Sequence, residues 1–247
     1  MGMDNGNSSK MNNVVHLGDC LEGMRGKPDK YYDLAICDPP YGIGEGNKKN
    51  KTRSSYTGFG DKKTWVNAKD YGGGEWDHTI PSLEYFSELR RVSVNQIIWG
   101  ANHIGDFVSS PCWIVWDKDN GDCDQADCEL AWTSFKSAVR KFTYRWQGLL
   151  QQNMKQKEER IHPTQKPVSL YKWLLKNYAK EGDKILDTHV GSGSSRIAAY
   201  DMGFEFEGWE IDPDYHKAQE KRFKQHVSQF KLFQPESKNG TSQQLTF

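Results

Sequence analysis

The chain lacks an excess of charge of either sign. Its 247 residues include 33 lysines and arginines and 33 aspartates and glutamates. A net charge of zero gives no global basic field, so binding to nucleic acid would need a local basic patch. The sequence also lacks a long apolar run, and its start, MGMDNGNSSK, is polar. We therefore expect no membrane span, no signal peptide and a cytoplasmic protein.

Paired cysteines are missing as well. The five cysteines are scattered and show no C-x-x-C spacing. This pattern argues against a zinc site and against a disulfide framework, and it suits a reducing compartment. The histidines show no metal-ligand spacing either, so we expect no metal.

Short apolar runs alternate with amphipathic segments along most of the chain, as is typical of strands alternating with helices. This order predicts an α/β fold with a mostly parallel sheet and helices on both faces. Residues 183–204 combine a strand, a glycine turn and a helix. The other expected strands are 14–19, 32–38, 95–102, 112–118, 140–146 and 206–212, and the other expected helices are 82–93, 166–180 and 213–227.

The composition divides the chain into three parts. We expect a flexible N-terminal segment over 1–12, one domain over 13–227 and a polar tail over 228–247. Within the domain, residues from about 43 to 81 lack apolar periodicity. Because this stretch is too long for an ordinary connection, we interpret it as a functional loop insertion.

The glycine turn lies where α/β sheets build ligand sites, after a strand and before a helix. Gly191 and Gly193 allow a sharp turn and a close approach of a ligand. About twenty residues later, Glu210 ends the next strand, where its carboxylate can accept hydrogen bonds from both ribose hydroxyls. Taken alone, the glycines also suit a plain strand-to-helix turn. Together with Glu210, they predict a site for a nucleoside cofactor.

The stretch Asp38-Pro39-Pro40-Tyr41 ends another predicted strand with an acid and two stiff prolines. A rigid turn with Tyr41 covering the core is one interpretation. The other is chemical: a carboxylate and the next backbone carbonyl are two acceptors beside a flat ring. They suit a planar heterocycle with an exocyclic amine, because accepting both N–H bonds stabilises the positive charge that develops when this poor nucleophile attacks.

These motifs, with HPTQKP (162–167) between them, resemble the β group of DNA amino-methyltransferases. The resemblance covers about 14–227 and implies a permuted Rossmann-like methyltransferase fold. It also implies S-adenosylmethionine as the cofactor and a flipped base in double-stranded DNA as the substrate. The acid that opens the tetrapeptide favours N6 of adenine, whereas serine would favour N4 of cytosine. The resemblance assigns the base to Asp38, Pro39, Pro40 and Tyr41, and the cofactor to Gly18 and Asp19 near its adenine, Lys166 at its methionine end, and Asp187, Gly191, Gly193 and Glu210.

One departure from the family pattern keeps alternatives open. The family usually has Asp-Pro-Phe before the glycine turn, whereas this chain has Asp187-Thr188-His189. His189 would pack less tightly on the cofactor or add a polar contact. An N4-cytosine or RNA amino-methyltransferase and a non-catalytic DNA-binding protein of the same fold remain alternatives. Modification of a protein glutamine is disfavoured, because such enzymes usually have asparagine where Asp38 stands.

The loop insertion is the expected DNA-binding segment, because the usual target-recognition segment before HPTQKP is short. Its cations alternate with aromatic residues, a composition that suits phosphate contacts and stacking beside an extruded base. A solvated loop with incidental aromatics is the alternative. The predicted DNA-binding residues are Lys48, Lys49, Lys51, Arg53, Lys62 and Lys63, and the cluster 140–145 extends the patch or forms a solvated strand face.

The tail contains two short glutamine-plus-hydrophobic stretches, Gln229–Phe233 and Gln243–Phe247. Both resemble peptides that dock on the replication sliding clamp, which makes the clamp a candidate partner. Accidental matches to such motifs are frequent, and the first stretch also suits an extension of the last helix. The sequence leaves the oligomeric state open, with a dimer among the options.

Overall fold

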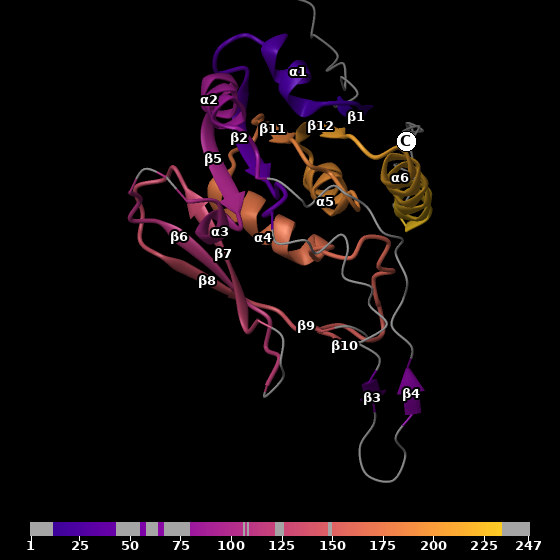
Figure 1. The fold of residues 1–247 in the computed structure, drawn as a ribbon. Helices are drawn as coiled ribbons and strands as arrows, with labels where there is room; N and C mark the ends of the chain where they lie inside the picture. The colour runs from indigo at the N-terminus through magenta and orange to yellow at the C-terminus, as the bar shows by residue number, and fades with distance from the viewer. Residues whose placement is uncertain are drawn as a thin grey trace, which may run out of the picture.

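The structure is a computed structural model. It describes residues 12–42, 55–57, 64–66, 80–105, 107, 109–121, 126–147 and 150–233. A central sheet separates two layers of helices (Figure 1). The expected N-terminal segment, most of the loop insertion and the end of the tail lie outside the described residues, so their assignment stays a prediction.

The central sheet has eight strands in the order β1-β12-β11-β2-β5-β7-β6-β8 within the described part of the chain. The first five strands are mutually parallel, β7 is antiparallel to β5 and to β6, and β8 is parallel to β6. The predicted α/β class with a mostly parallel sheet is confirmed. The strands are β1 (Asn13–Leu17), β2 (Tyr32–Cys37), β5 (Ser93–Trp99), β6 (Trp113–Asp117), β7 (Cys128–Thr133), β8 (Arg140–Thr143), β11 (Lys184–Asp187) and β12 (Glu205–Glu210).

Short polar side chains cap the first turns of the first, the second and the last helix. Asp19 accepts a hydrogen bond from the backbone N–H of Leu21 at 2.7 Å, and Ser82 accepts one from Tyr85 at 3.2 Å. Asp212 caps the last helix by accepting from the backbone N–H of Tyr215 at 3.1 Å. The helices are α1 (Cys20–Arg25), α2 (Leu83–Val92), α3 (Ala101–Ile104), α4 (Val168–Tyr178), α5 (Ser194–Met202) and α6 (Pro213–Phe233).

The alternation of side chains along the strands feeds two separate cores. Leu34 and Ile36 of β2 face the layer that contains α4 and α5, where Leu170 and Ala198 are buried. Ala35 and Cys37 face the opposite layer, where α1 and α2 bury Met24, Phe86 and Leu89. Because apolar side chains cover both faces, the sheet is fixed in register and its strand ends are the places left for polar chemistry.

Several elements lie outside the expected pattern. Hydrophobic periodicity does not predict the strand β7, because a cysteine and an acid interrupt the apolar run of Cys128–Thr133. It does not predict α1 either, because that helix is too short to show a helical period. A two-stranded hairpin, β9 (Trp146–Gln147) and β10 (Leu150–Gln151), occupies part of the short segment before HPTQKP. The loop insertion contributes an antiparallel pair, β3 (Ser55–Thr57) and β4 (Thr64–Val66), which is separate from the central sheet. The last helix continues through Gln229–Phe233.

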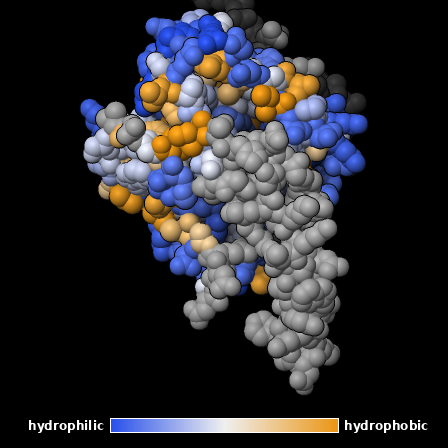
Figure 2. All heavy atoms as spheres, in the orientation of Figure 1, coloured by the Kyte–Doolittle hydropathy of each residue, from blue (hydrophilic) through white to orange (hydrophobic). Residues whose placement is uncertain are grey.

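On the described part of the face in Figure 2, apolar residues form separate groups among hydrophilic ones. Among the residues that the structure describes, no helix combines the length and the hydropathy needed to cross a membrane.

Candidate active site

Five parallel strands end on one edge of the sheet, and the predicted site residues lie at four of these ends. Asp38 follows β2 and Gly18 follows β1, while Asp187 and Glu210 are the last residues of β11 and β12. Gly18 donates its backbone N–H to the Glu210 carbonyl at 2.9 Å, which ties two of the strand ends together. The fold therefore brings the predicted base-binding and cofactor-binding motifs to the same carboxyl edge.

Asp38 accepts hydrogen bonds on both carboxylate oxygens. Lys166 Nζ donates to Oδ2 at 2.5 Å, and the Tyr41 hydroxyl donates to Oδ1. Burial raises the pKa of Asp38, and the neighbouring Lys166 ammonium opposes that rise. A carboxylate offers about four lone-pair positions. Two donors therefore leave it the capacity to accept a further N–H.

The ring of Tyr41 lies directly against the backbone of Gly100, which follows β5. A Cβ atom at Gly100 would lie 2.0 Å from Cε1 of Tyr41, and Gly100 has a φ of +67°. Both facts require glycine at this position. The His103 ring stacks on Tyr41 with 5.5 Å between centroids and 20° between planes. The tyrosine is thus held in one orientation beside Asp38.

Lys166 contacts Asp38, which the sequence did not predict. Its predicted place at the methionine end of the cofactor stays a prediction. The side chain of Lys166 is 2% exposed, and its ammonium also lies 3.1 Å from Oε2 of Glu129 in β7. Burial alone would lower the pKa of Lys166, but the Asp38 and Glu129 carboxylates raise it. The lysine is therefore a buried cation between two acids.

The glycine turn, where the sequence predicted a sharp turn, has a left-handed backbone at both glycines. Gly191 has a φ of +51° and Gly193 a φ of +75°. Glu210 accepts the N–H of Gly191 on Oε2 at 2.8 Å and the N–H of Asp212 on Oε1 at 2.9 Å. Burial raises the pKa of Glu210, and these backbone donors oppose the rise. The Glu210 carboxylate thus fixes the backbone of the glycine turn and lies directly beside it.

Asp187 is the most buried acid of this edge. Ser195 Oγ donates to Oδ2 at 2.5 Å, and the backbone N–H of His189 donates to Oδ1 at 3.0 Å. Burial raises the pKa of Asp187 to about 7, and the charges of Asp38 and Glu210 add to the rise. The carboxylates of this edge are therefore close enough to influence one another.

The residues that replace the family's Pro-Phe form a polar network. The Tyr85 hydroxyl lies 2.7 Å from Thr188 Oγ1, which lies 2.9 Å from Nδ1 of His189. Burial lowers the pKa of His189 to about 4, so its imidazole is neutral at neutral pH. Hydrogen bonds therefore link the residues after β11 to α2, and the effect of the departure on cofactor binding stays a prediction.

The strand ends fit the adenosine part of S-adenosylmethionine. Ile211 and Leu17 are 63% and 54% exposed, and they flank Glu210 and Gly18. Exposed apolar side chains suit the faces of a purine, and the carboxylate suits the ribose hydroxyls. A sulfonium cation would also favour the charged forms of these acids, whose pKa values burial raises.

The six predicted DNA-binding residues, Lys48, Lys49, Lys51, Arg53, Lys62 and Lys63, lie outside the described residues. Their role stays a prediction. Among the residues that the structure describes, no group of three or more histidines, cysteines or acids could hold a metal ion.

The structure adds Glu129, Lys118 and His103 to the surroundings of the tetrapeptide. An acid within the apolar run of Cys128–Thr133 is a signal that could have indicated Glu129. No comparable signal marks His103, because its contact with Tyr41 arises only when the ends of β2 and β5 are side by side.

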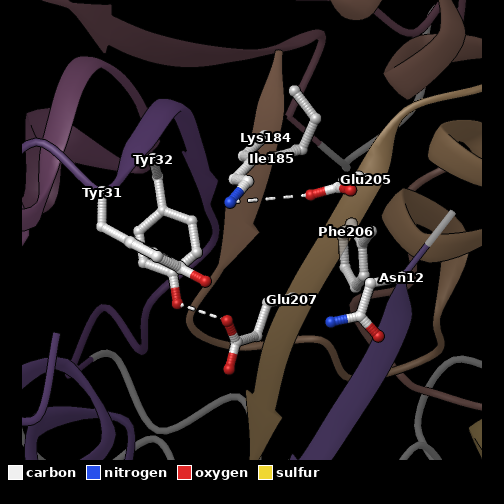
Figure 3. A pocket seen from close by; sticks show the side chains of 8 residues that line it. All are labelled: Asn12, Tyr31, Tyr32, Lys184, Ile185, Glu205, Phe206 and Glu207. Carbon is white, nitrogen blue, oxygen red and sulfur yellow. Dashed lines mark hydrogen bonds and ion pairs between the residues drawn. The ribbon is translucent and has the colours of Figure 1, made fainter. Parts of the chain in front are cut away.

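A shallow pocket lies at the opposite, amino edge of the sheet (Figure 3). It is lined by the first residues of β2, β11 and β12, and two of its acids, Glu205 and Glu207, have partners within it. Because it lies at the wrong end of the parallel strands, it is separate from the candidate active site.

The fold and the residues at this edge define a class of protein. It consists of Rossmann-like enzymes in which a glycine turn for a nucleoside cofactor lies beside a loop that begins with an acid and contains a tyrosine. A family model described as DNA methylase matches residues 98–221, half of the chain. The chain belongs to this family of N6/N4 DNA amino-methyltransferases. The family depends on S-adenosylmethionine, which confirms the cofactor predicted from the sequence. The matched residues include HPTQKP and the glycine turn, and the tetrapeptide precedes them.

Two relatives and one solved structure are similar to the chain. Type II methyltransferase M.HinfI from Haemophilus influenzae is 26% identical over 86% of this chain and 68% of its own length. Putative methylase YubD from Escherichia coli (strain K12) is 23% identical over 83% of this chain and 87% of its own. The structure of PvuII DNA methyltransferase (cytosine-N4-specific) has a TM-score of 0.52 and 13% identity, and it covers 89% of this chain and 92% of its own. This last likeness supports the fold.

Proposed function

We propose that this DNA amino-methyltransferase methylates N6 of an adenine that is flipped out of double-stranded DNA, with the tetrapeptide 38–41 holding the base. The observation that carries the proposal is the position of the Asp38 carboxylate. It lies at the carboxyl end of β2, beside Tyr41, and β2 pairs with β11, the strand that ends in Asp187. A base held by Asp38 would therefore face the cofactor turn.

Asp38 and the Pro39 carbonyl would grip the exocyclic amine. The lone pair of this amine is delocalised into the purine, so the nitrogen is a poor nucleophile. Two acceptors on its hydrogens draw it towards tetrahedral geometry and stabilise the positive charge that develops during attack. The resemblance to the β group, in which an acid at this position favours adenine and serine favours cytosine, supports adenine as the target.

Tyr41 would stack against the flipped base. Its ring is already fixed by Gly100 and His103, so little ordering is needed when the base enters. Stacking of a base on an aromatic side chain contributes about 1–3 kcal/mol. It also offsets part of the unstacking energy of base flipping, which amounts to a few kcal/mol.

Asp187, Gly191, Gly193 and Glu210 would hold the cofactor, with Gly18 and Asp19 beside its adenine. When bound, S-adenosylmethionine supplies an electrophilic methyl group. The protein's task is then to orient the amine towards it and to exclude water from a site whose acids are already buried.

The product decides the proposal. Expression in cells that lack DNA methylation, digestion of their DNA and mass spectrometry of the nucleosides should reveal N6-methyladenine. N4-methylcytosine in place of N6-methyladenine would overturn the adenine assignment and leave the family membership intact. Methylated RNA with unmodified DNA would exclude double-stranded DNA as the substrate.

Cations of the loop insertion would bind the DNA backbone. Replacing Lys48, Lys49 and Lys51 with glutamine should weaken binding to all DNA sequences alike. Each lost phosphate contact lowers the slope of log affinity against log salt concentration by about 0.9. An unchanged slope in a fluorescence-anisotropy titration would exclude these lysines from the interface.

A further inference from the structure

Four charged side chains of alternating sign form a continuous row that ends at the tetrapeptide. Lys118 Nζ lies 2.6 Å from Glu129 Oε1, and Glu129 Oε2 lies 3.1 Å from Lys166 Nζ. Lys166 Nζ in turn lies 2.5 Å from Asp38 Oδ2. We call Lys118, Glu129, Lys166 and Asp38 the charge row. It links the antiparallel part of the sheet, which carries Glu129, to the end of β2.

Two aromatic rings and two carboxylates lie near the ammonium of Lys166. The rings of Trp99 and Tyr41 lie 5.4 Å and 5.8 Å from Nζ, and the two carboxylates of the charge row lie closer. A buried cation is costly unless it is paired and hydrogen-bonded. Its position is therefore set by where its two acids are, and Glu129 is one of them.

Glu129 is charged at neutral pH. Burial would raise the pKa of Glu129, but Lys166 and Lys118 lower it to about 2. Glu129 stands opposite Trp116 in the β6–β7 ladder, so its backbone is fixed by strand pairing. Lys118 follows β6 and holds the other oxygen of the same carboxylate. Glu129 is thus a rigid anionic anchor at the far side of Lys166.

This second anchor matters when Asp38 accepts the amine of a target base. With Asp38 as its only anion, Lys166 would follow the movements of that carboxylate and compete with the amine for its lone pairs. With Glu129 in place, the ammonium keeps its position while Asp38 takes on a new donor. We propose that Glu129 is a positioning residue for methyl transfer, which acts through Lys166 to hold the Asp38 carboxylate in its productive orientation.

The proposal rests on the proposed role of Asp38, and it predicts a loss in kcat. Glu129→Gln should lower kcat about 10-fold to 100-fold, the range expected when a reacting group is misplaced by about 1 Å. KM for DNA and the calorimetric Kd for S-adenosylmethionine should change less than kcat, because the proposed role of Glu129 is to position Asp38 through Lys166 and not to bind either ligand. Glu129→Asp keeps the charge and should recover part of kcat.

Glu207→Gln is the matched control. Glu207 is a strand carboxylate whose side chain is 13% exposed and which is ion-paired with Lys27 at 2.7 Å, but it lies at the opposite edge of the sheet. Glu207→Gln removes a buried ion pair, as Glu129→Gln does, but Glu207 does not contact the charge row. If Glu129→Gln lowers kcat no more than Glu207→Gln at a temperature where both are folded, the proposal is overturned.

A double-mutant cycle tests whether Glu129 acts through Lys166. In a Lys166→Met background, Glu129→Gln should have little further effect on kcat, whereas multiplicative losses would contradict the proposed route. If Lys166→Met does not fold, Lys118→Met replaces it. Lys118→Met removes the cation beside Oε1 of Glu129. It should lower kcat, but by less than Glu129→Gln does, and an unchanged kcat would count against the charge row.

The two proposals fail in different ways. If Asp38→Ala keeps full turnover, the proposed function fails and the role of Glu129 fails with it. If Asp38→Ala abolishes turnover while Glu129→Gln behaves like its control, only the positioning role is lost.

Discussion

At the amino edge of the sheet, Glu207 accepts hydrogen bonds from the Tyr32 hydroxyl at 2.8 Å and from Lys27 Nζ at 2.7 Å (Figure 3 shows the tyrosine contact). Burial would raise the pKa of Glu207, but these donors and His16 lower it. At the carboxyl edge of the same sheet, burial raises the pKa of Asp187 to about 7 and that of Glu210 above its usual range.

The difference lies in the partners that each edge supplies. Glu207 has a cation of its own, whereas Asp187 is held by a hydroxyl and a backbone N–H that carry no charge. At the amino edge the cation of Lys27 stabilises Glu207. At the carboxyl edge Asp38 has a cation, Lys166, but Asp187 and Glu210 have uncharged donors and are in a state that a ligand can improve. Such perturbed groups cluster at functional sites, which agrees with the edge where α/β sheets bind ligands.

Removal of the Asp38 carboxylate should have the largest effect on activity and separates the two edges most clearly. Asp38→Ala should raise the barrier to methyl transfer by several kcal/mol, because the developing charge on the amine loses its acceptor. Binding of S-adenosylmethionine, measured by calorimetry, should persist. Turnover close to that of the unmodified protein would remove Asp38 from the mechanism.

The same change at the other edge provides the control. Glu207→Ala removes a paired carboxylate and should lower the free energy of unfolding while kcat per folded molecule stays the same. A loss of kcat comparable to that of Asp38→Ala would mean that both edges serve catalysis. It would contradict the proposed difference between the two edges.

The sequence could predict the features that depend on local order along the chain. Asp38, Asp187 and Glu210 each end or directly follow an apolar run, and the parallel order of the strands then places them on one edge. The glycine turn was recognisable because a left-handed backbone favours glycine at Gly191 and Gly193.

The rest depends on contacts between distant segments. Glu129 reaches Lys166 only because β7 inserts between β5 and β6, and hydrophobic periodicity does not reveal that strand. His103 meets Tyr41 because β2 and β5, which are far apart in the sequence, pair side by side. Hydrophobic periodicity reports which face a residue takes, and it carries no information about its partner across the sheet.

The fit between Gly100 and Tyr41 offers a smaller and more selective test. Gly100→Ala places a methyl group within the space of the Tyr41 ring and adds strain at a positive φ. Kcat should fall because the stacking platform is displaced. Gly182→Ala is the matched control, since Gly182 has a φ of +86° and open space around it. Strain alone costs about 1 kcal/mol, so equal losses of activity in both variants would contradict a role for the Tyr41 contact.

The last prediction concerns the dependence of stability on pH, and it tests the comparison through the sign of the change. The folded-state pKa of Asp187, about 7, lies above its ordinary 3.8, so the folded protein keeps a proton that the unfolded chain releases between these values. Asp187 therefore lowers stability as pH rises through this window, by up to a few kcal/mol. Glu207 has a lowered pKa, so its stabilisation is present above its ordinary value and is lost as pH falls through the folded-state pKa.

Urea unfolding at about pH 4 and about pH 7 separates the two acids. The unmodified protein should lose stability relative to Asp187→Asn on going to the higher pH, since the asparagine holds no proton to release. Relative to Glu207→Gln, it should gain stability over the same interval, because only the carboxylate becomes charged beside Lys27. Measured without cofactor, the two differences should have opposite signs. Equal signs would show that Asp187 and Glu207 affect the pH dependence of stability in the same way. Burial of acids would then not distinguish the candidate active site from the rest of the sheet.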